Sequence, residues 1–212
     1  MTAVIQEFNE LCSSANPVFK DFGKIPRLNR EIVITEKIDG TNACVIVAGT
    51  ESESIDSWVV SAQSRTRIIT PEDDNAGFAR WVQANSQELK QLGLGYHYGE
   101  WWGQKIGRNY GLKEKRFSLF NVSRWTEVRP ACCHVVPIIY SGPILGNGSW
   151  STDPDLVYMP TDSARMLTWK GSYAAPGFMN PEGVVIWHVA AQQYFKITCK
   201  NDEKPKGSKE LG

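Results

Sequence analysis

The sequence predicts an α+β domain in which antiparallel β-sheet predominates and helices flank the sheets. Most segments between turn signals are short runs rich in β-branched or aromatic residues, which are typical of strands. Only one longer stretch, within residues 70–93, has the apolar spacing of a helix. The chain shows no internal repeat, and its 212 residues suffice for one domain with its own core. We therefore expect a single domain over residues 1–212 that ends in a lysine-rich tail over residues 201–212.

Two strands open the predicted domain, at residues 31–37 and 42–48. They are joined through Asp39-Gly40, a dipeptide that tolerates a positive φ and therefore favours a reversal or kink of the chain. The residues directly before this turn thus lie at the end of a strand, which holds their side chains in place.

The next predicted elements are strands at residues 58–63 and 96–102, with one helix between them. Thr70 is a suitable N-cap for this helix, Pro71 suits its first position and Gly93 its end. We expect the helix to pack on a sheet through the apolar side chains that share one of its faces. These are Phe78, Trp81, Val82, Leu89 and Leu92.

Four further strands and one short helix complete the prediction. The strands cover residues 116–122, 134–140, 182–189 and 193–200. The short helix covers residues 162–169, in a stretch that Pro and Gly punctuate. Strands therefore dominate the pattern, which is typical of the α+β class.

Charge, hydropathy and cysteine content exclude several classes of protein. Lys and Arg number 23, as do Asp and Glu, so no overall positive field can hold a polyanion and any nucleic-acid contact must be local. The longest purely apolar run, residues 43–48, is far shorter than the ~18 residues of a membrane helix. The five cysteines form no C-x-x-C pair, which fits neither a disulfide framework nor a zinc site. We expect a soluble, cytoplasmic protein with no targeting segment and no membrane partner.

The candidate chemistry begins at the stretch from Glu36 to Asn42. Lys37 ends a strand directly before the turn, Asp39 follows two residues later, and Gly40 allows a backbone or a phosphate to come close. Such a lysine is held in place and does not move freely in solvent. The same four-residue pattern also occurs at ordinary hairpin corners, so it needs support from the rest of the chain.

Charged residues also lie on three other predicted strands. Glu100 shares a strand face with two tyrosines, because alternate side chains point the same way. Glu182 opens an apolar strand, and Lys196 and Lys200 share one face of the last strand. Charged groups interleaved with aromatic rings suit a phosphate cleft better than a core. Solvated strand faces are the alternative, which fits Lys200 but fits Glu100 badly because large rings surround it.

Several short motifs follow one another along the chain. They are Lys37-Ile38-Asp39-Gly40, Ser64-Arg65-Thr66-Arg67, Gly99-Glu100-Trp101-Trp102-Gly103, Phe117-Ser118-Leu119-Phe120-Asn121, Pro181-Glu182-Gly183-Val184-Val185, and Tyr194-Phe195-Lys196 with Lys200. In this order the motifs resemble those of the covalent nucleotidyltransferases, the family of polynucleotide ligases and mRNA-capping guanylyltransferases. The resemblance covers most of the chain, and five or six motifs together are far more specific than any one. Residues 37–42 and 106–121 most resemble the phage RNA ligase 2-like branch.

The resemblance implies a nucleotidyltransferase domain with the ATP-grasp-like ligase fold. Its activity would be that of an ATP-dependent RNA ligase in RNA repair, which seals 5′-phosphate and 3′-hydroxyl ends through a lysyl-AMP intermediate. The cofactors would be ATP and either Mg²⁺ or Mn²⁺. The partner would be RNA ends, either in a nicked duplex or in a single strand. The chain ends soon after the last motif, so we also expect a protein partner in place of a C-terminal domain. The resemblance to the phage branch leaves open that a phage encodes the protein.

The resemblance also assigns roles to residues. Lys37 would attack the α-phosphorus of ATP, with Lys196 and Glu182 as the other catalytic residues. A lysine attacks only when neutral, so cations and burial must lower its ordinary pKa of ~10.4. Glu100 and Glu182 would hold either the ribose hydroxyls or the metal through water, and Phe120 would stack on the adenine. The nucleotide-binding residues would be Glu36, Ile38, Gly40, Asn42, Arg65, Glu100, Phe120, Glu182, Lys196 and Lys200.

Two departures from the branch leave other enzymes open. Asp39 stands where this branch often has His, and Asn121 where it often has Asp, while Lys-x-Asp-Gly is the form of DNA ligases and capping enzymes. A DNA ligase or a GTP-using capping-type guanylyltransferase is the alternative enzyme. The non-enzyme alternative is an RNA-end-binding module that lost turnover, and the full set of lysines and glutamates argues against it.

Overall fold

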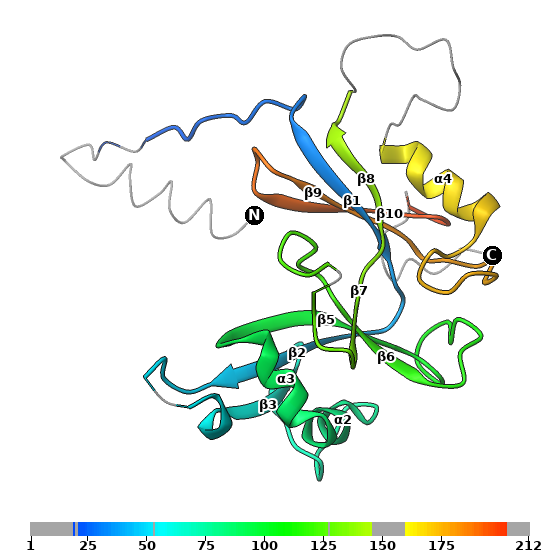
Figure 1. The fold of residues 1–212 in the computed structure, drawn as a ribbon. Helices are drawn as coiled ribbons and strands as arrows, with labels where there is room; N and C mark the ends of the chain where they lie inside the picture. Colours follow the sequence, from blue (N-terminus) through cyan, green and yellow to red (C-terminus); the bar gives the residue numbers. More distant parts are fainter. Residues whose placement is uncertain (1–18, 20, 53, 127, 146–159, 203–212) are drawn as a thin grey trace, which may run out of the picture.

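Two β-sheets form the framework of the molecule, which a computed structural model describes for residues 19, 21–52, 54–126, 128–145 and 160–202 (Figure 1). The upper sheet of Figure 1 has the strand order β10-β9-β1-β8, and the lower sheet has the order β4-β3-β2-β5-β6-β7. Neighbouring strands are antiparallel except for β6 and β7, which are parallel. The predicted sheet-rich α+β class is confirmed. The predicted tail falls mostly outside the described residues.

The elements of the described residues have the following bounds. The strands are β1 (Glu31–Lys37), β2 (Thr41–Ala48), β3 (Val59–Ser64), β4 (Ile68–Ile69), β5 (Gly95–Gly103), β6 (Lys115–Leu119), β7 (Cys133–Val135), β8 (Ile138–Pro143), β9 (Gly183–His188) and β10 (Gln193–Thr198). The helices are α2 (Phe78–Ala84), α3 (Ser86–Leu89) and α4 (Pro160–Lys170), with 3₁₀ turns at Ile55–Ser57 and Lys90–Leu92. Among the described residues, no helix is both long enough and apolar enough to cross a bilayer.

The chain passes between the two sheets at two points. Residues 38–40 join β1 of the upper sheet to β2 of the lower sheet, and residues 136–137 join β7 of the lower sheet to β8 of the upper sheet (Figure 1). Lys37 is the last residue of β1. The first crossing therefore puts Lys37 at the junction of the sheets.

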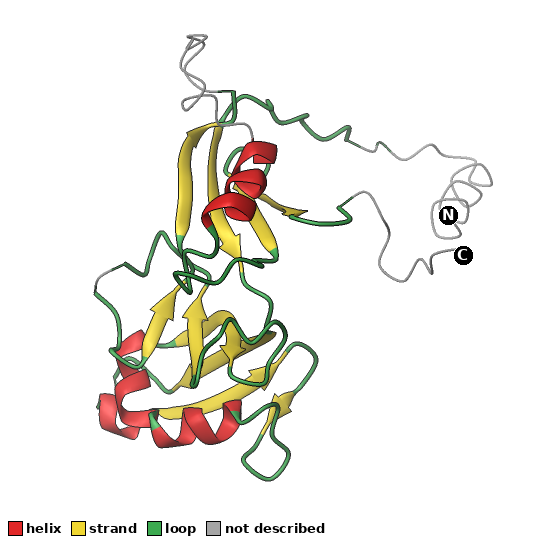
Figure 2. Ribbon diagram, turned by 90° about the vertical axis from the view of Figure 1, so that its right-hand side faces the viewer, coloured by secondary structure: helices red, strands yellow, loops and turns green. Residues whose placement is uncertain are grey.

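Helices α2 and α3 cover one face of the lower sheet (Figure 2). The ring of Phe78 lies 5.4 Å from that of Trp101 and 5.2 Å from that of Phe117, measured between centroids. Because strand side chains alternate, the neighbours of Trp101 in β5, Glu100 and Trp102, point away from this aromatic core. The helix-free face of the lower sheet thus carries Glu100.

Helix α4 covers one face of the upper sheet (Figure 2). Ile32 and Ile34 of β1 pack there with Val184 of β9 and Leu167 of α4. Lys37 has the opposite parity to these isoleucines, so its side chain leaves β1 on the face that α4 does not cover. A third buried cluster lies at the crossing points and connects the sheets. It contains Ile38, Trp102, Tyr110, Val136 and Ala175.

The helix predicted within residues 70–93 is wrong in its start and in its continuity. Thr70 Oγ1 accepts a hydrogen bond from Asp73 N, which closes a turn outside the helix. The helix begins later, at Phe78, and its N-cap Gly77 has no side chain to cap it, although Asp74 Oδ1 accepts a hydrogen bond from Ala79 N in the first turn. Asn85, with φ −108° and ψ 14°, then separates α2 from α3.

The strand predicted at residues 134–140 is divided between the two sheets. Pro137 has no N–H to continue a ladder, so β7 ends before it and β8 begins after it in the other sheet. The last strand is also shorter than predicted. It ends at Thr198, whose N–H donates to Asp202 Oδ1 at 2.7 Å instead of to a strand.

Candidate active site

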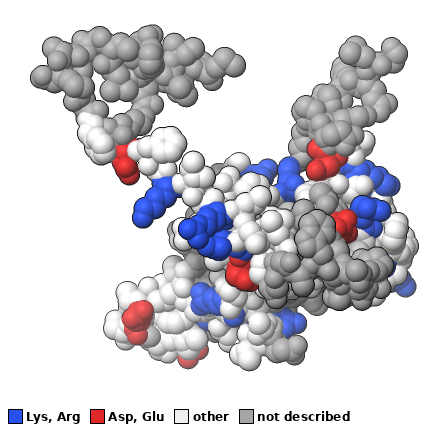
Figure 3. Space-filling view, turned by 90° about the horizontal axis from the view of Figure 1, so that it is seen from above, with Lys and Arg blue, Asp and Glu red and all other residues white. Residues whose placement is uncertain are grey.

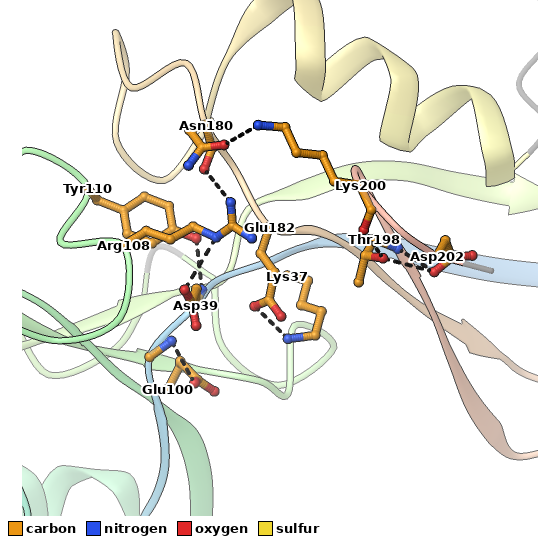
Figure 4. Close-up of polar contacts among 11 residues, drawn as sticks. Lys37, Asp39, Glu100, Arg108, Tyr110, Asn180, Glu182, Thr198, Lys200 and Asp202 are labelled. Carbon is orange, nitrogen blue, oxygen red and sulfur yellow. Dashed lines mark hydrogen bonds and ion pairs between the residues drawn. The ribbon is translucent and has the colours of Figure 1, made fainter. Parts of the chain in front are cut away.

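Lys37 and Glu182 form an ion pair at the junction of the sheets (Figure 4). The distance between Lys37 Nζ and Glu182 Oε2 is 2.6 Å, and the two side chains are 24% and 15% exposed. Two of the three predicted catalytic side chains are therefore together and partly shielded from water.

The strand register explains this pairing. Lys37 of β1 lies opposite Gly183 of β9, and Glu182 directly precedes that strand. Gly183 also lies opposite Thr198 of β10, and a Cβ at this position would clash with the carbonyl oxygen of Ile197. A glycine here therefore lets β10 approach β9 closely beside the Lys37 site.

The turn after Lys37 is held by side chains from the lower sheet. Glu100 Oε1 accepts a hydrogen bond from Gly40 N at 3.1 Å, and the Tyr110 hydroxyl accepts one from Asp39 N at 2.8 Å. A Cβ at Gly40 would lie 2.8 Å from the Cβ of Trp102. These contacts fix the position of the turn and therefore the position of Lys37 at the end of β1.

Glu100 lies in a crowded electrostatic environment. Burial raises its pKa to about 7, the positive charge of Lys37 opposes this rise, and the negative charges of Glu182 and Asp39 add to it. Near neutral pH the site therefore has a carboxylate that a further cation would keep ionised.

Glu100 and Glu182 suit a divalent cation that also has phosphate and water ligands. Within the described part of the chain, no group of three or more His, Cys, Asp and Glu side chains could hold a metal alone. Mg²⁺ commonly takes one or two carboxylates plus substrate phosphates and water. The donor set thus fits the expectation of a metal held through water.

Sequence reasoning missed a connection across the site made by Arg108. Its Nε lies 3.3 Å from Asp39 Oδ2, and its Nη1 donates to the carbonyl oxygen of Asn180 at 3.2 Å (Figure 4). Arg108 thus joins the turn after Lys37 to the segment before Glu182. No local signal identifies it, because Arg108 lies more than 65 positions from both partners in the sequence.

The two candidate lysines of the last motif have different surroundings. Lys196 of β10 lies opposite Val185, which in turn lies opposite Thr35 of β1, so Lys196 shares the sheet face of Lys37 and is exposed. Lys200 follows the strand, and its Nζ donates to Asn180 Oδ1 at 3.0 Å. Lys196 is therefore oriented for a ligand over the Lys37 face, while Lys200 contacts the loop before Glu182.

The structure does not bring the Glu36 carboxylate to Lys37. Glu36 is 1% exposed and points to the α4 face, where it accepts hydrogen bonds from Ser172 Oγ, Tyr173 N and Ala174 N at 2.6–2.9 Å. Burial raises its pKa, and these hydrogen bonds oppose the rise. A nucleotide could contact only the main chain of Glu36.

The remaining predicted nucleotide-binding residues divide into those near Glu100 and those apart from it. Asn42 lies directly opposite Glu100 in the β2–β5 pair. Phe120 follows β6, and its N–H donates to the carbonyl oxygen of Tyr98 two positions before Glu100. Ile38 is buried between the sheets, and Arg65 is exposed after β3. The geometry thus groups Asn42 and Phe120 with Glu100.

Comparisons with known proteins support the relationship that the motifs indicate. Residues 30–198 match a family model described as RNA ligase. A comparison with curated protein sequences gives no match.

Similar solved structures include three variants of the RNA ligase of Naegleria gruberi, each described with ATP and Mn. Their TM-scores are 0.50, 0.53 and 0.51 at 17%, 16% and 15% sequence identity. The matches cover 79%, 82% and 82% of this chain and 48%, 51% and 51% of those proteins. The chain thus spans about half the length of these ligases, and at this identity the likeness shows the fold.

The family match extends over most of the 212 residues and includes every strand from β1 to β10, as well as Lys37 and Glu182, which form an ion pair at the junction of the sheets. This chain belongs to the RNA ligase family.

Proposed function

We propose that this chain is an ATP-dependent RNA ligase that seals 5′-phosphate and 3′-hydroxyl ends through a Lys37–AMP intermediate. The observation that carries the proposal is the ion pair of Lys37 and Glu182 beside the turn held by Glu100. In this arrangement a lysine amine and two carboxylates lie close together at the junction of the two sheets, which supports a role in nucleotide transfer. Family membership and the Naegleria gruberi ligases described with ATP and Mn give independent support.

Lys37 must lose a proton before it can attack. In the contact with Glu182, the negative carboxylate stabilises the ammonium form. Activation therefore requires that Glu182 turn to another cationic partner and that Lys37 face positive charge instead. Lys196 on the same sheet face and a phosphate-bound cation would supply that charge.

A divalent cation, when bound, would neutralise charge on the phosphates of ATP. Glu100 and Glu182 would hold it through water, because both carboxylates interact with Lys37. Glu100 also accepts a hydrogen bond from Gly40 N, in the turn that follows Lys37. The same carboxylate would therefore contact both the hydrated cation and the turn that positions Lys37.

The three chemical steps balance without an external oxidant or reductant. In the first, Lys37 Nζ forms a bond to the α-phosphorus of ATP, pyrophosphate leaves and the lysine proton passes to solvent. In the second, an oxygen of the RNA 5′-phosphate attacks the same phosphorus and releases Lys37. In the third, the RNA 3′-hydroxyl attacks the 5′-phosphorus, forms the phosphodiester and releases AMP.

The test is to incubate the chain with a divalent metal and α-labelled ATP or GTP, and then with RNA and DNA ends. The proposal expects covalent label from ATP and sealing of substrates with ribose at the 3′-hydroxyl end. Label from GTP alone would favour a capping-type enzyme, and equal sealing of an all-deoxy nick would favour a DNA ligase. An absence of label and sealing, with RNA still bound, would favour the binding module.

The cellular setting is part of the proposal. We infer that the chain works as a single nucleotidyltransferase domain in the cytoplasm, where ATP and RNA ends are both present. Its equal numbers of acidic and basic residues favour a protein partner that strengthens its hold on RNA.

A further inference from the structure

The helix-free face of the lower sheet continues outward from Glu100 as a row of aromatic rings. Tyr98 and Tyr96 lie two and four positions before Glu100 in β5, so all three side chains share one face. The tyrosines are 47% and 62% exposed, and they lie on the part of β5 that pairs with β2 but extends beyond the pairing with β6, which begins at Gly99.

The two tyrosine rings are also aligned with each other. Their centroids are 6.4 Å apart and their planes differ by 15°. Tyr98 lies beside Phe120, whose N–H donates to the Tyr98 carbonyl oxygen. The aromatic surface is therefore continuous with the Glu100 site and leads away from Lys37 along β5.

The balanced charge of the chain favours bases over phosphates as the groups that these rings bind. Lys and Arg equal Asp and Glu in number, and both kinds of side chain are present on the face of the molecule that Figure 3 shows. A protein with such mixed charge gains little from counterion release. Stacking of unpaired bases on aromatic side chains contributes about 1–3 kcal/mol per base without needing positive charge.

We propose that Tyr96 and Tyr98 form a stacking platform for unpaired bases of the RNA end that approaches Lys37–AMP. This inference rests on the proposed function and adds a subsite to it. The platform would act after nucleotide transfer to Lys37, because it lies outward from Glu100 on the open sheet face. Tyr96, the more exposed ring, would contact RNA without contributing to the ATP step.

The experiment measures three quantities for Tyr96→Ala, Tyr98→Ala and the double Phe variant in the full chain. They are the rate of labelling with ATP, the affinity for a 5′-phosphorylated single-stranded RNA and the rate of sealing. Trp169→Ala is the matched control, because it removes a ring on α4 that is 74% exposed. We expect about 10-fold weaker RNA binding for Tyr96→Ala, wild-type labelling, and near-normal binding for the Phe variant.

An RNA with abasic positions near its end makes the test specific. If a base stacks on Tyr96, the abasic RNA should bind wild type about 10-fold less tightly, and Tyr96→Ala should add little further loss. Independent, multiplying losses would overturn the platform. So would a loss of ATP labelling in Tyr96→Ala, which would assign the rings to the adenine site, or a change in oligomeric state, which would assign them to a second copy.

The outcomes separate this inference from the proposed function. If wild type forms lysyl-AMP and Tyr96→Ala binds and seals RNA equally well, the platform alone is wrong. If wild type forms no lysyl-AMP, the proposed function is wrong whatever the RNA affinity of the tyrosine variants.

Discussion

On the α4 side of β1, the carboxylate of Glu36 accepts three hydrogen bonds from residues 172–174, whereas on the other side Glu100 holds Gly40 N beside Lys37. Burial raises the pKa of both groups. The difference lies in their partners: Glu36 is satisfied by neutral donors of the fold, while Glu100 faces Lys37, Glu182 and Asp39. Burial alone therefore does not distinguish a structural carboxylate from one suited to chemistry.

The largest expected effect tests whether nucleotide transfer takes place on the side of β1 where Lys37 and Glu100 lie. Lys37→Ala should abolish covalent labelling with ATP, because it removes the group at the end of β1 that the turn holds in place. Lys37→Arg should be equally inactive, since a guanidinium stays protonated and cannot attack. Gel autoradiography of matched amounts of folded protein measures both. Undiminished label in either variant would contradict the assignment.

The two glutamates provide the sharpest comparison. Glu100→Gln should lower the labelling rate by about 100-fold or more. It removes the negative charge that would hold the cation, and the cation stabilises the charge that develops on the phosphates in the transition state. Its free energy of unfolding should stay within about 1 kcal/mol of wild type or rise, since an amide oxygen can still accept from Gly40 N.

Glu36→Gln is the matched control and should show the opposite pattern. It should lower the free energy of unfolding by roughly 1–2 kcal/mol, because its single amide oxygen can replace only one of the two carboxylate oxygens that accept hydrogen bonds from residues 172–174. The molecules that remain folded should still label. Urea denaturation and labelling of the same samples decide the matter, and a labelling defect confined to Glu36→Gln would reverse our assignment of the two carboxylates.

The lysines of the last motif extend the comparison to β10. Lys196→Ala should slow labelling by about 100-fold, because its ammonium shares the sheet face of Lys37. Lys200→Ala should have a smaller effect, since it loses a hydrogen bond to Asn180. Single-turnover rates give the ranking, and a larger effect at Lys200 would mean that the end of β10 reorients when ATP binds.

The smallest effect is a pH dependence of stability caused by Glu100. Its pKa of about 7 in the folded chain lies above its ordinary value of 4.5, so between these values the folded state binds more protons than the unfolded state. Raising the pH through this window should therefore destabilise wild type more than Glu100→Gln. Denaturation at pH 5 and pH 8 measures the difference, and identical pH profiles would show that Glu100 titrates normally.

The features predicted from sequence are those that depend on local pattern. Alternation and turn chemistry were enough for β1, β2, β5 and β9, and for the position of Lys37 at a strand end. The start of the helix was misjudged because Thr70 and Pro71 form a capping pattern, whereas Thr70 closes a turn and α2 begins only after Gly77. The strand at residues 134–140 was overextended because its β-rich composition outweighed Pro137.

The motif residues of the site were predicted from the sequence, but the residues that support the site from distant parts of the chain were missed. Arg108 and Tyr110 contact the turn at Asp39 from about 70 positions away, and local spacing carries no signal for such contacts. Glu36 shows the converse error, in which two residues adjacent in sequence were expected to share a site. Its place next to Lys37 in sequence favoured a shared role, but strand alternation sends the two side chains to opposite faces.

The most direct test of the central claim is to locate the adduct. Wild type is incubated with ATP and Mg²⁺, digested, and the peptides are sequenced by tandem mass spectrometry under conditions that preserve a phosphoramidate. The account predicts one AMP on the peptide that contains Lys37, and its loss when 5′-phosphorylated RNA is added. An adduct on Lys196 or Lys200 with Lys37 unmodified would contradict it.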